Sequence, residues 1–141
     1  MIDRDSVIES FLKNFVQKDR VERSYFELSS LKKRNKFTDR LNHSWEKVFK
    51  MKCLTRVEKE DDYAEKIQEL LNFKNDEVCY VISNYDEYDD QFLPFKKVFH
   101  EIYSRGFGTI LVNTSADTFF LDTEQVQGPA PRFIGKRIIG E

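Results

Sequence analysis

Hydrophobic residues in the first half of the chain recur every three or four positions, which is the spacing of an amphipathic helix. The pattern predicts three helices, over residues 5–18, 38–52 and 61–71. Ser6 and Glu9 have the spacing of a capping box in the first helix, and Thr38 is a suitable N-cap for the second. Between these two helices, residues 24–29 could form a short strand.

The third predicted helix has its apolar side chains on one face, and the polar residues 72–76 end it. The side chains on this face are Tyr63, Ala64, Ile67, Leu70 and Leu71. Such a face is typical of a helix that packs against the rest of the protein.

The second half of the chain has a different pattern. Residues 77–83 form a nearly continuous apolar run with several β-branched side chains, as expected for a strand that is covered on both faces. We therefore expect Val81 and Ile82 to be buried in a central strand of a sheet. An apolar stripe then predicts a helix over residues 93–104, with Pro94 where a helix can begin.

Two further strands are predicted over residues 108–112 and 118–121, joined by a turn-forming segment. Because a strand–helix–strand crossover joins parallel strands, we expect 77–83 and 108–112 to be parallel, with 118–121 antiparallel at one side. Residues 132–139 form either an edge strand or an extended tail. The prediction is an α/β fold, with α+β as the alternative, in which N-terminal helices pack on a small mixed sheet in a single domain of residues 1–141.

Composition supports a folded protein that stays in the cytoplasm. The 141 residues are 40% hydrophobic and include 13 Phe and six Tyr, enough for one aromatic core. The N-terminus lacks the apolar core of a signal peptide, and no stretch approaches the roughly 18 apolar residues of a membrane span. Cys53 and Cys79 have no CxxC partner, and we expect both to be free, buried thiols in a reducing compartment.

Charge is divided unevenly along the chain. Residues 31–56 contain nine basic and two acidic side chains, whereas residues 58–90 contain twelve acidic and three basic ones. The formal net charge of −2 hides this separation. Two opposed electrostatic regions are an arrangement that steers and orients a charged partner.

No motif in the sequence indicates catalysis. His43 and His100 are far apart, and neither belongs to an HxxxH or HxH pair that would suggest a metal site. A GxSxG elbow, a P-loop and an HExxH helix are all missing from the sequence. We therefore expect a binding protein and not an enzyme, with no catalytic residue, no metal site and no cofactor.

The acidic segment that follows the strand at 77–83 is the candidate binding site. It consists of Tyr85, Asp86, Glu87, Tyr88, Asp89 and Asp90. Ligands of open α/β sheets gather at the carboxyl ends of strands, where this segment begins, and tyrosines within a charged rim suit recognition of a basic protein. Two other interpretations remain open: a solvated loop with its aromatic rings packed beneath it, and a metal-dependent enzyme.

The metal-dependent alternative needs carboxylates from separate elements to converge on one cation. Asp117, Asp122 and Glu124 could join the acidic segment for this purpose, although no spacing demands it.

A nucleic-acid-binding regulator is the remaining alternative. Lys32, Lys33, Arg34, Lys36 and Arg40 could contact phosphates. A nucleic-acid module is usually basic overall, whereas this chain has a pI of about 5.8 and acidic segments beside the basic one. We therefore expect nucleic acid not to be the partner.

The segments EVCYVISNYDEYDD and FHEIYSRGFGTILVNTSADTFFLDTE, within residues 77–124, resemble the immunity proteins that protect bacteria from polymorphic or contact-dependent toxins. The resemblance implies an antitoxin whose acidic face holds a cognate toxin domain, often a basic nuclease. Asp86, Glu87, Asp89 and Asp90, with Tyr85 and Tyr88, would then cover the toxin's substrate groove.

Overall fold

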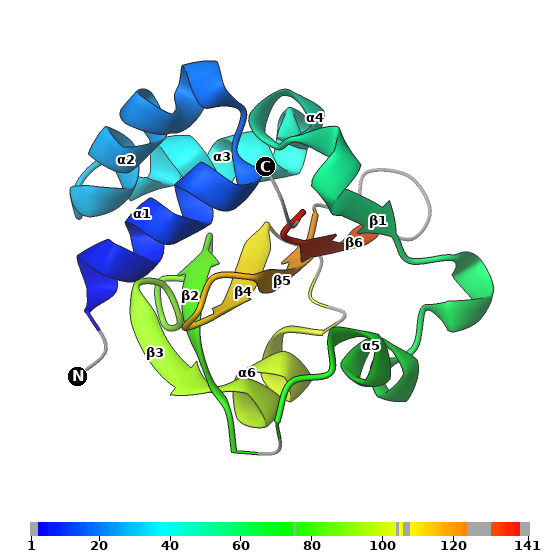
Figure 1. The fold of residues 1–141 in the computed structure, drawn as a ribbon. Coiled ribbons are helices and arrows are strands. Elements are labelled where there is room, and N and C mark those ends of the chain that lie inside the picture. Colours follow the sequence, from blue (N-terminus) through cyan, green and yellow to red (C-terminus); the bar gives the residue numbers. More distant parts are fainter. Residues whose placement is uncertain (1–2, 75, 104, 106–107, 124–130, 139–141) are drawn as a thin grey trace.

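The computed structural model describes residues 3–74, 76–103, 105, 108–123 and 131–138 (Figure 1). Within these residues, six strands form one antiparallel sheet in the order β1-β6-β5-β4-β2-β3. The strands are β1 (Leu54–Arg56), β2 (Val78–Ser83), β3 (Gln91–Pro94), β4 (Thr109–Asn113), β5 (Thr118–Asp122) and β6 (Arg132–Lys136).

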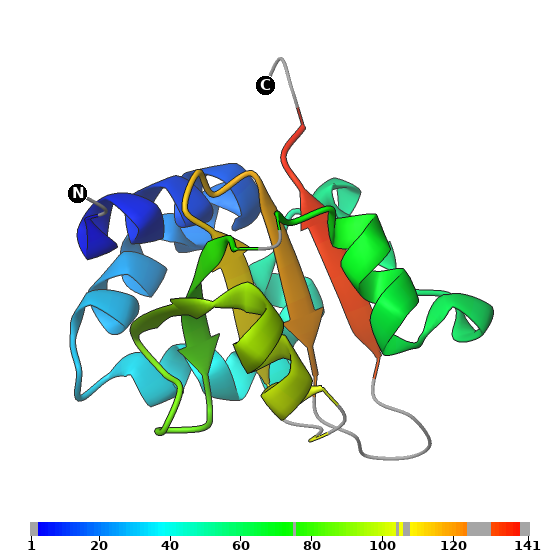
Figure 2. The ribbon, with the colours of Figure 1, turned by 90° about the horizontal axis from the view of Figure 1, so that it is seen from below.

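Helices cover both faces of this sheet (Figures 1 and 2). One face carries α1 (Arg4–Phe15), α2 (Val21–Ser29), α3 (Arg34–His43) and α4 (Trp45–Val48), and the other carries α5 (Ala64–Leu71) and α6 (Phe95–Ile102). Three short 3₁₀ turns join these elements: η1 (Lys18–Arg20), η2 (Met51–Cys53) and η3 (Lys59–Asp61). Among the described residues, no helix is both long enough and apolar enough to cross a membrane.

The helices on both faces of the sheet explain why the apolar run of β2 is continuous. Side chains alternate between the faces of a strand, so Tyr80 and Ile82 join the core under α1 to α4, whereas Cys79 and Val81 join the core under α5 and α6. Val81 and Ile82 are fully buried, and β2 lies inside the sheet between β3 and β4, as predicted. Cys53 and Cys79 are both free and buried, which confirms the expectation for the thiols.

The helices predicted over 5–18, 61–71 and 93–104 are present as α1, α5 and α6. Asp3, and not Ser6, is the N-cap of α1: the carboxylate of Asp3 accepts hydrogen bonds from the Asp5 amide and the Ser6 hydroxyl. This cap gives a hydrogen-bond acceptor to a backbone amide that has no partner within the first turn of the helix.

The short strand expected over 24–29 is wrong, because these residues belong to α2. The buried side chains of this segment are Ser24, Glu27 and Leu28, which is helical spacing that the polar identities of two of them conceal in the sequence.

The single helix predicted over 38–52 is divided into α3 and α4, which meet at Ser44. Since α3 begins at Arg34, Thr38 lies inside the helix and does not cap it. The Thr38 hydroxyl instead donates to the carbonyl oxygen of Asn35, a bond that competes with regular helical bonding.

The expected parallel pairing of β2 with β4 is wrong, since Tyr80 faces Val112 in an antiparallel register. The reason is the unpredicted strand β3, which forms a hairpin with β2 and reverses the chain before α6 begins. The crossover through α6 therefore joins β3 to β4, which are parallel to each other on either side of β2.

The segment predicted as an edge strand or tail at 132–139 contains β6, which is an interior strand between β5 and β1. The edge on this side is the three-residue strand β1, which pairs with β6 and is too short to give a periodic signal. The combination of helices with one sheet confirms the α/β prediction. The mixed sheet that was predicted is wrong, because every strand pair is antiparallel.

Candidate functional site

The predicted binding segment is the turn that connects β2 to β3. Its residues are Tyr85, Asp86, Glu87, Tyr88, Asp89 and Asp90. The amides of Tyr88 and Asp89 both donate to the carbonyl oxygen of Tyr85, and the Asp90 amide donates to the carbonyl oxygen of Val81. Asp90 has a φ of 61°, a left-handed conformation that aspartate tolerates better than most residues.

Asp89 faces the protein and holds Arg34. Each Asp89 carboxylate oxygen accepts a hydrogen bond of 2.8 Å from the Arg34 guanidinium, at Nε and at one terminal nitrogen. Arg34 is only 3% exposed and also donates to the Leu28 carbonyl oxygen and the Tyr80 hydroxyl. Burial alone would lower the pKa of Arg34, but the bonds to Asp89, together with the electrostatic effects of Tyr80, Asp89 and Asp90, raise that pKa.

Asp90 is also turned inward. Its carboxylate accepts a hydrogen bond of 2.6 Å from Arg4 Nε and a second bond from the Tyr80 hydroxyl. Burial alone would raise the pKa of Asp90, but these two bonds, with the charges of Arg34 and Arg4, lower it. Through Asp89 and Asp90 the turn is tied to α1 and α3, so these two carboxylates have a structural role.

The other four residues of the turn are two tyrosines that pack against each other and two exposed carboxylates. Tyr88 is buried, Tyr85 is half-buried, and their rings meet edge to face with centroids 6.3 Å apart. The Arg105 guanidinium lies 5.3 Å from the Tyr85 ring centroid and donates to Glu87 at 3.0 Å. Asp86 and Glu87 are therefore the exposed carboxylates of the turn, and Glu87 already has a cationic partner. Partner binding by this turn stays a prediction.

The positional argument for the turn does not apply to this fold. The rule that ligands gather at the carboxyl ends of strands holds for parallel sheets, whereas every strand pair here is antiparallel. Asp117 and Asp122 lie at opposite ends of β5, and Glu124 is outside the described residues. Within the described part of the chain, no three His, Cys, Asp or Glu residues are grouped so that they could hold a metal ion.

The basic segment at 32–40 is partly used inside the protein. Arg34 is buried on Asp89, and Arg40 forms a two-pronged ion pair with the buried carboxylate of Glu27. Lys32 and Lys36 are exposed, and the Lys33 ammonium lies 4.0 Å from the centroid of the exposed Phe26 ring. Fewer cations are therefore free to contact phosphates than the sequence suggested.

A second acidic surface lies around η3 and α5. The helix α5 packs on the face of the sheet that α1 to α4 do not cover. We call this surface the acidic α5 surface and define it by Glu58, Glu60, Tyr63, Glu65, Glu69 and Leu70. Lys66 of the same segment pairs with Glu69 at 3.8 Å. A groove next to this surface is lined by Glu58 and Leu70 together with four cations, Lys52, Arg56, Lys136 and Arg137. Tyr63 is 50% and Leu70 is 36% exposed, although the helical pattern placed both on the packing face. The signal that could have found this surface is the excess of carboxylates over residues 58–69, since apolar spacing does not reveal which apolar residues stay uncovered.

Arg132 fixes the beginning of this surface to the sheet. It donates to both oxygens of Asp62, at 2.8 and 2.9 Å, and its guanidinium lies 4.3 Å from the Tyr103 ring centroid. The Arg132 Nε atom is 3.5 Å from a carboxylate oxygen of the buried Asp122. Burial raises the pKa of Asp122 to about 7, although the Arg132 charge acts in the opposite direction.

Comparison of this chain with protein-family models, with curated proteins and with solved structures finds no match.

Proposed function

We propose that this chain is an immunity protein that neutralises a cognate toxin domain, a basic nuclease, by binding it through an acidic surface. It acts as an antitoxin by occupying its partner and is not an enzyme.

The acidic α5 surface is the observation that carries this proposal. Glu58, Glu60 and Glu65 are exposed there, in the same segment as the half-exposed Tyr63 and the partly exposed Leu70. Binding energy at protein interfaces is concentrated in a few large side chains, of which Tyr is among the most frequent. Carboxylates around such an anchor attract a basic partner and set its orientation.

The distribution of charge over the two faces supports the same proposal. The helix α3, which has more basic than acidic side chains, packs on one face of the sheet, and α5 packs on the other. A nuclease binds an anionic substrate and therefore has a cationic groove. The acidic α5 surface presents carboxylates to such a groove, while the exposed lysines beside and within α3 lie on the other face of the sheet.

The proposal is tested by co-expression with the C-terminal domain of the protein encoded directly upstream. If that domain is a toxin, its expression alone should stop growth, and the intact chain should restore it. An upstream domain that is harmless, or whose toxicity the chain leaves unchanged, contradicts the proposal.

The surface is tested with Glu58→Gln/Glu60→Gln/Glu65→Gln. Because charges at the rim of an interface mainly set the association rate, this triple variant should associate with the toxin domain roughly tenfold more slowly at low salt. The matched control is Asp19→Asn/Asp39→Asn/Glu46→Gln, which removes three exposed carboxylates from η1, α3 and α4. Equal rates for the triple variant and its control would contradict the assignment of the surface.

The turn is tested separately with Asp86→Asn/Glu87→Gln, which leaves the inward-facing Asp89 and Asp90 intact. If the turn covers the toxin's groove, this pair should slow association as the α5 variant does. If only the α5 variant is affected, the binding surface is the one on α5.

A further inference from the structure

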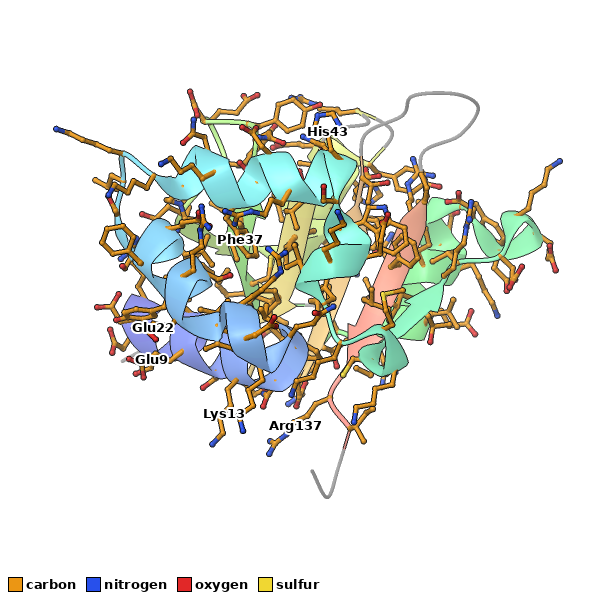
Figure 3. All side chains as sticks on the ribbon, turned by 90° about the horizontal axis from the view of Figure 1, so that it is seen from above. Glu9, Lys13, Glu22, Phe37, His43 and Arg137 are labelled. Atoms are coloured by element: carbon orange, nitrogen blue, oxygen red, sulfur yellow. The ribbon has the colours of Figure 1, made fainter. Side chains whose placement is uncertain are left out.

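A recess of about 740 Å³ lies between the end of α1, η1 and the residues that follow β6. Its rim carries four cationic side chains, Lys13, Lys18, Lys50 and Arg137, and one carboxylate, Glu22. Figure 3 shows Lys13 and Arg137 projecting from the same side of the molecule, although 124 positions separate them in the sequence. The recess is therefore cationic in a protein whose net charge is −2.

The backbone around the recess is fixed by contacts between distant segments. Val16 forms an isolated antiparallel bridge with Phe49, and the Lys50 amide donates to the Phe15 carbonyl oxygen at 2.8 Å. The Lys50 ammonium donates to the Lys13 carbonyl oxygen at 3.0 Å, which holds that cation at the wall. On the other wall, the Arg137 amide donates to the Asp117 carbonyl oxygen at 2.9 Å. A preorganised site loses less free energy when a ligand binds.

Part of the lining of the recess is apolar. Val21 and Ile138 are half-buried and line the space, and the fully buried Val16 lies behind them in the core. Small-molecule sites usually have volumes of about 300–1,000 Å³ and combine an apolar lining with a few polar groups that fix orientation. This recess has both properties, with cations as the orienting groups.

We propose that this recess binds an amphipathic organic anion, in which a phosphate or carboxylate head contacts Lys13, Lys50 and Arg137 and a short apolar body covers Val21 and Ile138. The recess adjoins the acidic α5 surface, because Arg137 and Ile138 also line a groove that contains Glu58 and Leu70. The proposal does not require toxin binding, since its test measures the ligand alone.

The test is calorimetric titration of the full chain with octyl phosphate below its micelle concentration. One octyl phosphate should bind per chain, and inorganic phosphate and octanol should each bind at least about tenfold more weakly, because each supplies only half of the contacts. Amide resonances of Val16 and Ile138 should shift on addition of octyl phosphate. No saturable binding, or equal affinity for octyl phosphate and octanol, overturns the proposal.

Lys13→Gln/Arg137→Gln should weaken octyl phosphate binding by roughly tenfold or more, because charge-assisted hydrogen bonds to the head are lost. The matched control Lys36→Gln/Lys96→Gln removes two exposed cations elsewhere and should leave affinity within about twofold, since distant charges are screened by salt. An equal loss in both variants overturns the proposal by showing a general effect of charge.

A lipid headgroup offers the same chemistry as a soluble phosphate ester. The second part of the experiment therefore measures retention of the protein on vesicles of phosphatidylglycerol. Binding of monomeric octyl phosphate with no retention on vesicles supports a soluble ligand. Retention on vesicles without binding of the monomer overturns the proposal in favour of a membrane surface.

Discussion

The Arg34 guanidinium and the Asp89 carboxylate form two parallel hydrogen bonds of 2.8 Å across 55 positions of the sequence. Arg34 begins α3, and Asp89 lies in the turn between β2 and β3, so this pair closes one end of the core beneath α3. Arg34 is 3% exposed, so its charge depends on the carboxylates beside it for compensation. A buried ion pair is most costly when one partner is left behind without the other.

Asp89→Asn should therefore lower the free energy of unfolding by about 3 kcal/mol, because it leaves the Arg34 charge buried and only partly compensated. Urea denaturation measures this change. Asp86→Asn is the matched control, since Asp86 is an exposed carboxylate of the same turn, and its effect should stay within about 0.5 kcal/mol. Similar effects for the two variants would mean that the pair has no structural importance.

The contrast between Asp86 and Asp89 also explains what sequence analysis missed at the candidate site. The two residues are three positions apart in a run of carboxylates, and nothing local distinguishes them. Their different surroundings depend on Arg34, which comes from α3 and binds Asp89 alone of the two. Spacing predicts which residues share a strand or a turn, but it does not predict the distant cation that turns one carboxylate inward.

The fold was predictable where apolar periodicity was long. The runs in β2, α6 and the β4–β5 hairpin identified these elements, because each buries several side chains at regular spacing. β1 and β3 have three and four residues, too few for a periodic signal. Missing β3 changed the predicted direction of β4, since every undetected strand in a hairpin reverses the chain.

Gly135 should not tolerate a side chain. A Cβ atom at this position would lie 2.0 Å from Cε1 of Phe119, the residue opposite in the β5–β6 pair. The Phe119 ring cannot move away easily, because it is fully buried against Phe15 and Phe49, with centroids 4.7 and 5.3 Å away. Gly135→Ala should lower the free energy of unfolding by about 2–3 kcal/mol, as measured by urea denaturation.

The companion double variant, Gly135→Ala/Phe119→Leu, shows whether the contact with Phe119 is the cause. A smaller side chain at 119 makes room for the methyl group, so the double variant should lose at least about 1 kcal/mol less than the sum of the single losses. Additive losses would exclude this explanation.

Alkylation should modify neither thiol readily in the folded protein. Cys79 is fully buried, and burial raises the pKa of its thiol to about 12, so the reactive thiolate is scarce at neutral pH. Mass spectrometry after treatment with iodoacetamide should show little change in the native protein and two added groups in denaturant without reductant. Two unmodified cysteines in denaturant would reveal a disulfide, and rapid labelling of native Cys79 would show that it is accessible.

Asp122 and Asp90 should make opposite contributions to the dependence of stability on pH. The pKa of Asp90 is lowered by folding, so its contribution is present above its unfolded pKa and is lost as pH falls through the folded value. The pKa of Asp122 is raised from 3.8 to about 7, so folding favours its protonated form. Its deprotonation therefore reduces the free energy of unfolding progressively as pH rises from about 4 to about 7.

Asp122→Asn removes this titration while it keeps the size of the side chain. Relative to the wild type, the variant should gain about 4 kcal/mol of stability as pH is raised from 4 to 8, since each unit of pKa shift corresponds to about 1.36 kcal/mol. Urea denaturation of both proteins across this range measures the difference, in which the contribution of Asp90 cancels. Arg132 keeps its two bonds to Asp62 in the variant, so the fold should be retained. A difference that does not change with pH, or that falls as pH rises, would show that Asp122 is ionised in the folded protein throughout, with the Arg132 charge outweighing burial.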